Sequence, residues 1–390
     1  MRYDFNQVID RRPTDSGKWN NYAEDVLPLW VADMDFQSPQ PVLQALQERV
    51  EHGIFGYPAY GFNFPGEKSE LRDVLVTRMQ QLYGWQIDAG DLFFLPGVVT
   101  GLNLTCHALS QPGGAVLIQT PVYPPFLRMG SNASQQLQTM QLTYLASGQY
   151  EVDWEAFEAA ITPETHLFTL CNPHNPVGRV FRRDELERMA EICLRHNLVI
   201  CSDEIHCDLL FSDQQHIPIA SLSPEVAQNT ITLMAPSKTY NIAGLGCSFA
   251  IIQNPELRKK FHQATSGLVG WVNVMGLTAA LAAYRYGQEW LDQLLVYLQG
   301  NRDYLSNYVA QELPGIRMAS PEGTYLAWLD CRAAGLPVSP YNFFLEKARV
   351  GLNDGATFGQ GGEGFVRLNF GCPRSTLTAA LERMQAALKG

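Results

Sequence analysis

Lys238 stands directly behind an apolar run, where its amine could act as a nucleophile. The run, residues 230–235, is rich in apolar and β-branched side chains and reads as a buried strand. Burial and neighbouring cations lower the pKa of an amine, and an amine of low pKa suits Schiff-base chemistry. Most lysines are exposed, so the position alone does not decide. A phosphate-binding P-loop is excluded, because no glycine precedes the lysine in residues 232–237.

The apolar run before it, residues 198–202, ends in a group of polar residues that includes Asp203, Glu204 and His206. Asp203 could pair with a protonated pyridine nitrogen and keep such a ring cationic, so that the ring accepts electrons. A helix-capping aspartate would fit the same residues. A metal site formed by the three side chains is a further alternative. This segment alone does not separate the three interpretations.

Two further segments place polar groups at strand or helix ends. Residues 166–171 are followed by NPHNPVG, residues 172–178, in which two Asn-Pro steps force turns. Asn175 could bond a ring oxygen of a cofactor, or the segment could be a tight loop. Leu95 to Gly101 precedes a helical pattern, and glycine at a helix start exposes N–H groups that favour a phosphate.

The elements that must position these residues alternate between strand and helix. Short apolar runs ended by turn residues predict buried strands. Residues 184–196 carry apolar side chains on one helical face, and Asp184 with Glu187 predicts a capping box there. This alternation predicts an α/β fold with a mostly parallel, helix-covered sheet, and ligands beyond the carboxyl ends of the strands. The predicted strands are 115–118, 166–171, 198–202, 230–235 and 248–252.

The pattern changes near Gly287. A long helical stretch from Trp290 to Val309 is followed by strand-like segments at 325–329 and 365–369 and by a last amphipathic helix. We expect a smaller α+β domain here. The predicted division is an N-terminal segment packing with the small domain (1–41), a large cofactor-binding domain (42–286) and a small C-terminal domain (287–390).

Composition excludes several functions. The formal net charge is −11, which argues against nucleic-acid binding and against an anionic membrane surface. No apolar stretch is long enough to span a membrane, and the first ten residues do not resemble a signal peptide. The eight cysteines show no CxxC pair. They are expected to be small buried side chains in a reduced compartment, which predicts a cytoplasmic protein.

Six motifs in order now indicate a family. The sequence resembles fold-type I enzymes that use pyridoxal 5′-phosphate (PLP), of the aminotransferase class I/II superfamily. It is most similar to the carbon–sulfur β-lyases of the MalY/PatB type, supported by DMDF (33–36), HGIFGYP (52–58), DEIH and NFGCPR. The resemblance covers nearly the whole chain. The six motifs are GVVTG (97–101), TPVYPPF (120–126), NPHNPVG (172–178), SDEIH (202–206), PSKTYN (236–241) and FVRLNFGCPR (365–374).

The resemblance implies a role for each motif. Lys238 would hold the cofactor as a Schiff base, Asp203 would pair with the pyridine nitrogen, and Tyr123 would stack on the ring. Asn175 would bond the 3′-oxygen and contact substrate, and Arg367 would clamp the substrate α-carboxylate. The residues implied to hold the phosphate are Gly97, Val98, Val99 and Ser237.

Three further residues belong to the predicted site. His206 is expected beside the cofactor, and Asp33 beside the substrate. Tyr57 is expected to reach the phosphate and the substrate from a neighbouring subunit, which makes a homodimer the working unit.

Some positions depart from many aminotransferases, as they also do in the lyase subgroup. Ala235 replaces the first serine of S-x-S-K, and His206 stands where a tyrosine is common. Gly246 stands where an arginine, eight residues after the lysine, often binds the phosphate. The phosphate must therefore rely more on the helix start and on hydroxyl groups.

The expected reaction is β-elimination from L-cystathionine, L-cysteine or S-substituted cysteines, which gives a thiol, pyruvate and ammonia. An aminotransferase on the same fold is the alternative, although no obvious second arginine is available for a dicarboxylate substrate. A regulatory protein of this fold would carry a DNA-binding domain, for which the match leaves no room. A metal hydrolase is disfavoured because no further ligand cluster stands out.

Overall fold

The computed structural model describes residues 2–58, 63, 69–211 and 214–390. Its largest sheet has seven strands, and all neighbouring pairs are parallel except those that involve β10. The predicted α/β class with a mostly parallel sheet is confirmed. In spatial order the strands are β2 (Leu92–Leu95), β10 (Ser248–Ile251), β9 (Thr230–Met234), β8 (Val199–Asp203), β7 (Thr165–Cys171), β3 (Ala115–Thr120) and β4 (Gln136–Gln141).

Sequence patterns missed β2 and β4. The β4 sequence QLQTMQ is mostly polar, because this strand lies at the edge of the sheet and pairs only with β3. Such a strand lacks the continuous apolar run that marks the buried strands beside it.

Alternate side chains of the central strands face two layers of helices. Val116 and Ile118 of β3 belong to the same buried cluster as Leu102 and Phe261. Leu117 lies in a different cluster, with residues of α6. Because successive strand residues point to opposite faces, helices cover both sides of the sheet. The helices of this part are α2 (Glu70–Tyr83), α3 (Val98–Leu109), α4 (Phe126–Asn132), α5 (Trp154–Ala159), α6 (Arg183–Arg195), α7 (Pro224–Gln228), α8 (Pro236–Thr239), α9 (Pro255–Thr265) and α10 (Val274–Tyr286).

The predicted capping box of α6 is wrong in its position. The N-cap is Arg182, two residues before the expected Asp184, and Glu185 Oε2 accepts a hydrogen bond from the Arg182 N–H at 3.0 Å. Asp184 instead pairs with the Arg182 guanidinium, 3.2 Å away. The capping glutamate is therefore Glu185 instead of Glu187, two residues upstream of the position expected.

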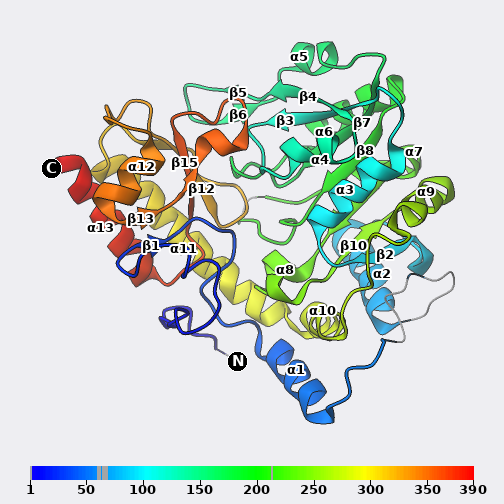
Figure 1. The fold of residues 1–390 in the computed structure, drawn as a ribbon, viewed down its shortest axis with the longest axis horizontal. Coiled ribbons are helices and arrows are strands. Elements are labelled where there is room, and N and C mark those ends of the chain that lie inside the picture. The colour runs from blue at the N-terminus through cyan, green and yellow to red at the C-terminus, as the bar shows by residue number, and fades with distance from the viewer. Residues whose placement is uncertain (1, 59–62, 64–68, 212–213) are drawn as a thin grey trace.

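A second, four-stranded antiparallel sheet lies in the C-terminal part, where strands were expected at 325–329 and 365–369. Figure 1 shows β12, β15, α12 and α13 on one side of the molecule and the seven-stranded sheet on the other. The strand order is β11 (Arg317–Met318), β12 (Leu326–Asp330), β15 (Phe365–Asn369) and β14 (Asn353–Asp354). The helices here are α11 (Gln288–Glu312), α12 (Pro340–Phe343) and α13 (Arg374–Lys389).

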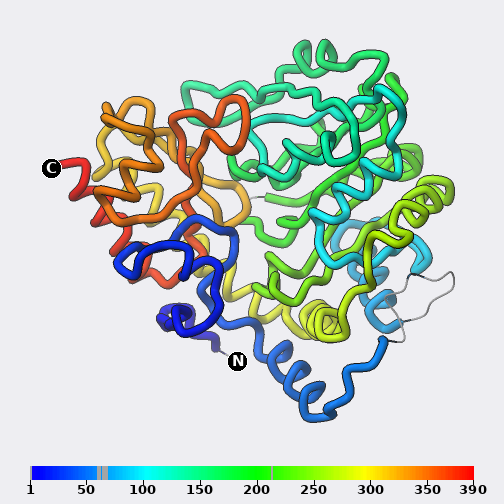
Figure 2. Tube along the Cα trace, viewed as in Figure 1, coloured from blue at the N-terminus to red at the C-terminus, as the bar shows by residue number. Residues whose placement is uncertain are grey.

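The N-terminal segment runs beside the C-terminal part (Figure 2). Strand β1 (Leu27–Pro28) pairs in parallel with β13 (Val350–Gly351), and α1 (Gln40–His52) follows. The Asn241 side chain, three residues after Lys238, bonds the backbone of Met34 and Phe36. The N-terminal segment therefore contacts the C-terminal part through β13, and the part that contains the seven-stranded sheet through Asn241. The division at residues 41 and 286 remains a prediction, with the larger sheet inside 42–286 and the smaller inside 287–390.

The cysteines and the helices bear on two of the expectations from composition. All eight cysteines are buried and carry free thiols. Among the described residues, no helix is both long and apolar enough to cross a membrane.

Candidate active site

A cavity of about 290 Å³ opens at the carboxyl ends of β7, β8 and β9, beside the start of α3. Parallel strands place their carboxyl ends on one edge of a sheet, so residues far apart in sequence meet there. All the predicted site residues except Asp33 and Tyr57 line this cavity. They are Gly97, Val98, Val99, Tyr123, Asn175, Asp203, His206, Ser237, Lys238 and Arg367.

Lys238 lies on the single-turn helix α8, which begins at Pro236 directly after β9. Proline suits the first position of a helix, so the chain turns there and carries the lysine into the cavity. Its Nζ donates a hydrogen bond to the Ala32 carbonyl oxygen at 2.6 Å. Burial lowers the pKa of Lys238 to about 8, assisted by the charge of Arg367 and opposed by Asp33 and Asp203. About a tenth of the amine is therefore uncharged at pH 7, far more than for an ordinary lysine, and the uncharged form is the one that a nucleophile requires.

Asp203 is the last residue of β8 and is buried. Its Oδ1 accepts a hydrogen bond from the Ile205 N–H at 3.1 Å. Burial raises the pKa of Asp203 to about 7, with a further contribution from Glu204, while Lys238 acts in the opposite direction. A carboxylate held in such surroundings binds a proton, or a protonated ring nitrogen, more readily than an exposed one.

Arg367 and Asn175 form one unit, although 192 positions separate them. Arg367 Nη1 donates to Asn175 Oδ1 at 2.9 Å, and Nη2 donates to the Trp30 carbonyl at 2.8 Å and to Asn353 Oδ1 at 3.2 Å. The Asn175 amide oxygen is thus occupied and its NH₂ group remains to donate. Burial lowers the pKa of Arg367 to about 10, which still leaves a cation at neutral pH.

His206 and Tyr123 complete the walls of the cavity. Burial lowers the pKa of His206 to about 3, with contributions from Lys238 and Arg367, so the imidazole is neutral at physiological pH. The Tyr123 backbone N–H donates to the Asn175 carbonyl at 3.1 Å, which ties the TPVYPPF segment to the NPHNPVG segment. An aromatic face and a neutral ring at this place suit a planar heterocycle.

The opposite end of the cavity suits a phosphate. Gly97 is the N-cap of α3, and Val98 and Val99 begin the helix, whose first N–H groups have no partner within it. Gly246 explains the missing arginine. Its φ is +57°, and a Cβ there would lie 3.3 Å from the Pro96 carbonyl, so the backbone at this position favours glycine.

Asp33 and Tyr57 lie outside the cavity wall. Both Asp33 oxygens accept hydrogen bonds from the Arg11 guanidinium, at 3.3 and 2.9 Å. The Tyr57 side chain is 77% exposed, and its ring meets the Trp271 ring edge to face with centroids 4.9 Å apart. Their roles toward substrate and phosphate remain predictions.

The structure adds residues that sequence patterns did not indicate. The Ala32 carbonyl oxygen accepts two hydrogen bonds, one from Lys238 Nζ and one from the Tyr325 hydroxyl at 2.9 Å. Asn353 holds Arg367 from a two-residue strand. A backbone carbonyl carries no sequence signal, and such a short strand has no detectable period.

The polar groups left over in the cavity fit PLP. Among the described residues, His206 Nδ1 and Arg367 Nε are buried without a hydrogen-bond partner. An aldehyde-reactive amine, a ring-nitrogen partner and a phosphate-binding helix start surround one space. Glu204 is not part of this wall, because its carboxylate bonds Ser202 and His216. A metal site formed by Asp203, Glu204 and His206 is therefore not supported by the geometry.

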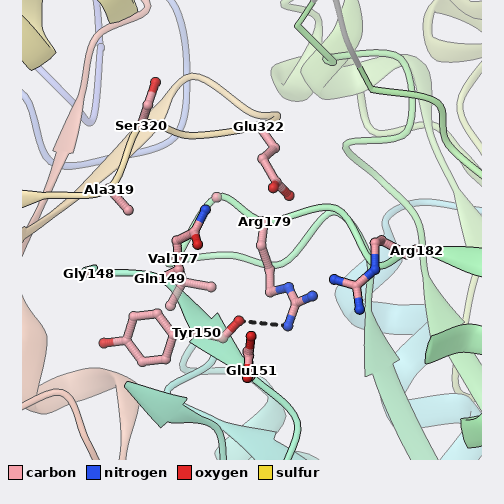
Figure 3. Close-up of a pocket in the computed structure, with 11 residues that line it drawn as sticks. Gly148, Gln149, Tyr150, Glu151, Val177, Arg179, Arg182, Ala319, Ser320 and Glu322 are labelled. Atoms are coloured by element: carbon pink, nitrogen blue, oxygen red, sulfur yellow. Dashed lines mark hydrogen bonds between the residues drawn. The ribbon is translucent and has the colours of Figure 1, made fainter. Parts of the chain in front are cut away.

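A second pocket lies between the loop after β7 and residues 319–322 (Figure 3). Arg179 donates there to both oxygens of Glu185 and to the Tyr150 carbonyl. Glu322 accepts from the Val180 N–H at 2.7 Å. The charged groups of Arg179, Arg182 and Glu322 already have partners within the protein, so this pocket offers less to a ligand than the first cavity.

Comparison with known proteins supports a PLP site in this cavity. A profile of the family described as Aminotransferase class I and II matches residues 24–384. Cystathionine beta-lyase PatB of Bacillus subtilis is 41% identical, over 98% of this chain and 99% of its own. The structure of OvoB is 45% identical, with a TM-score of 0.93 and full coverage of both chains. That of cystalysin from Treponema denticola, which contains PLP, is 32% identical with a TM-score of 0.93, over 100% of this chain and 99% of its own.

Proposed function

Because the chain belongs to the aminotransferase class I and II family, we propose that it is a PLP-dependent carbon–sulfur β-lyase. It cleaves L-cystathionine, L-cysteine or cysteine S-conjugates by β-elimination, with water, to a thiol, pyruvate and ammonia. The observation that carries this proposal is the 41% identity with a cystathionine β-lyase along nearly the whole of both chains. The cavity that surrounds Lys238 supplies groups for this chemistry.

The cofactor would be held at five points. Lys238 Nζ would bind its aldehyde carbon, and Asp203 would hold a proton on its ring nitrogen. The Asn175 NH₂ group donates to its 3′-oxygen, because the amide oxygen is already used by Arg367. Tyr123 covers one face of the ring. The start of α3, with Ser237, binds the phosphate.

When bound, PLP supplies an electron-withdrawing ring that stabilises negative charge at the substrate Cα. Arg367 binds the substrate α-carboxylate and so orients the Cα–H bond. Lys238 Nζ, when not bound to the cofactor, would lie beside the substrate Cα and would take its proton. Neutral His206 adds no charge that would compete with this proton transfer.

Pyruvate release without any added 2-oxo acid tests the proposal. We expect the holoenzyme to form pyruvate and free thiol in equal amounts from cystathionine, cysteine and S-methylcysteine, assayed anaerobically side by side. An aminotransferase needs an oxo-acid acceptor and forms no pyruvate from cystathionine alone. A reaction that starts only when 2-oxoglutarate is added would favour that alternative.

The working unit that we propose is a homodimer in which Tyr57 reaches the neighbouring site. Ile54, Phe55 and Tyr57, with Leu268 and Trp271, are large apolar side chains that stand 48–77% exposed. The Tyr57–Trp271 ring contact brings the two segments together. Large apolar side chains gathered on a surface are typical of an interface, and a second copy of this chain is the partner that would bring Tyr57 to a cavity.

Subunit mixing tests this arrangement. Lys238→Ala and Tyr57→Ala chains are each expected to be weakly active, the first for lack of the amine and the second for lack of the crossing side chain. A mixture contains hybrid dimers in which one site has both wild-type residues, so activity should reappear. A monomeric mass in light scattering, or a mixture no more active than its parts, would contradict the homodimer.

We infer a cytoplasmic location from the free, buried cysteines, since a reducing compartment keeps thiols unpaired. Fractionation of cells that express the tagged chain tests this inference.

A further inference from the structure

Glu204 is a buried carboxylate that the proposed reaction does not use. It follows Asp203 directly and is fully buried. Its Oε1 accepts from the Ser202 hydroxyl at 2.8 Å and from the Ile219 N–H at 3.3 Å, and its Oε2 lies 2.7 Å from His216 Nε2. Hydrogen bonds to the ionised form of a carboxylate favour that form, and Glu204 acts as a negative charge on Asp203.

His216 supports that charge without cancelling it. The imidazole is buried, and among the described residues its Nδ1 has no hydrogen-bond partner. A doubly protonated ring would leave a charged N–H unsatisfied at Nδ1, which costs more than leaving a bare lone pair there. The arrangement therefore favours a neutral imidazole with its proton on Nε2, donated to Glu204. The carboxylate remains a net negative charge.

This charge lies beside the residue that meets the cofactor ring. Asp203 and Glu204 are consecutive, and the Glu204 backbone is anchored to the neighbouring strand by its N–H bond to the Leu233 carbonyl at 2.9 Å. Glu204 is one of the groups that raise the pKa of Asp203, after burial itself, while Lys238 acts against it. Two anions in one low-dielectric region increase the proton affinity of whatever group they face.

We propose that Glu204, held by His216, is a positioning residue that acts through Asp203 and keeps the proton on the ring nitrogen of PLP. This inference rests on the proposed function, in which Asp203 pairs with that nitrogen. Glu204 touches neither cofactor nor substrate. Its part is to place a second negative charge behind the carboxylate that does.

The test is Glu204→Gln in the holoenzyme, loaded with PLP that carries ¹⁵N in the ring. The amide is isosteric, can still accept from Ser202 and Ile219, and can donate to His216 once the imidazole proton moves to Nδ1. We expect the ring nitrogen to lose its proton about one pH unit lower than in the wild type, a tenfold loss of proton affinity. We also expect kcat to fall about tenfold while KM stays within about twofold.

His216→Gln is the matched control, because it keeps a donor to Glu204 and leaves the carboxylate charge in place. Its ring nitrogen should titrate as in the wild type, even if the protein melts at a lower temperature. Equal ring-nitrogen titration in Glu204→Gln and wild type, together with lower thermal stability, would overturn the proposal and leave Glu204 a purely structural residue. A shift of equal size in His216→Gln would overturn it too.

If Glu204→Gln does not yield folded protein, the double variant Glu204→Met/His216→Phe replaces it. Both partners of the buried pair are then apolar, which can leave stability nearly unchanged. The negative charge is gone, so the ring-nitrogen titration should move in the same direction, and an unchanged titration contradicts the proposal. The proposed lyase activity is judged separately on the same wild-type sample. Absence of pyruvate would refute the substrate class, and a ring nitrogen that never carries a proton would refute the pairing with Asp203.

Discussion

The cavity around Lys238 and the pocket around Arg179 both combine arginines with carboxylates. They differ in whether each charged group has a partner of opposite charge. In the pocket of Figure 3, Arg179 is neutralised by Glu185 and Arg182 pairs with Asp184. In the cavity, burial holds the pKa of Lys238 and Arg367 below their usual values and the pKa of Asp203 above it. Buried charged groups without a full set of partners indicate a binding site, because a ligand can supply the missing partners.

The sharpest way to test this contrast is Lys238→Ala. Without the amine the variant has neither an anchor for the aldehyde nor a base for the Cα proton, so kcat should fall by about 10³-fold or more. Pyruvate release measures the loss, and the absorption band of lysine-bound cofactor should disappear. Substantial remaining turnover would remove Lys238 from the mechanism.

Arg367→Lys and Arg179→Lys form a matched pair across the two regions. The lysine at 367 cannot make a two-pronged bond to the α-carboxylate, so kcat/KM should fall about 100-fold, chiefly through KM. The same exchange at 179 should leave kcat/KM unchanged and cost about 1–2 kcal/mol of unfolding free energy, because a charged hydrogen bond to Glu185 is weakened. Equal kinetic losses in both variants would abolish the distinction between the regions.

Asp203→Asn tests the pH dependence of the cofactor-free protein. The pKa of Asp203 is about 7 when folded, above the ordinary value of 3.8. The folded state therefore binds more protons than the unfolded state between these values, and this group makes the protein less stable as pH rises from about 4 to 7. Chemical denaturation should show a decline of a few kcal/mol that the asparagine variant lacks. An equally steep decline in Asp203→Asn would show that other groups cause it.

The smallest effect is expected from Arg182→Ala. Its side chain is 62% exposed, and exposed ion pairs contribute little. Unfolding free energy should change by about 0.5 kcal/mol or less, with no change in kcat/KM. A thermal melt and a pyruvate assay suffice. A kinetic defect here would give the second pocket a function that its paired charges do not suggest.

Much of the site could be predicted from local sequence. Lys238, Asp203 and Asn175 each follow a short apolar run, and parallel strands bring such positions to one edge. The strand β4 escaped prediction because an edge strand is not uniformly apolar. The capping box was placed at Asp184 because its side chain also fits an N-cap, whereas the helix begins at Arg183.

Other features depended on contacts between distant segments. Arg367 meets Asn175 across 192 positions, and Lys238 meets the Ala32 carbonyl across 206. The pairing of Glu204 with His216, and of Asp33 with Arg11, likewise follows from how loops pack on the finished sheet. No periodicity or motif encodes these contacts.

Local sequence was enough to predict which side chains are suited to chemistry and on which kind of element each one stands. Strand-forming runs and the turns that end them are local properties, set by side-chain shape and by hydrophobic pattern. The packing of distant segments sets which of these groups share a cavity and which buried charges lack a partner. Both depend on burial, and burial is a property of the packed molecule rather than of any segment.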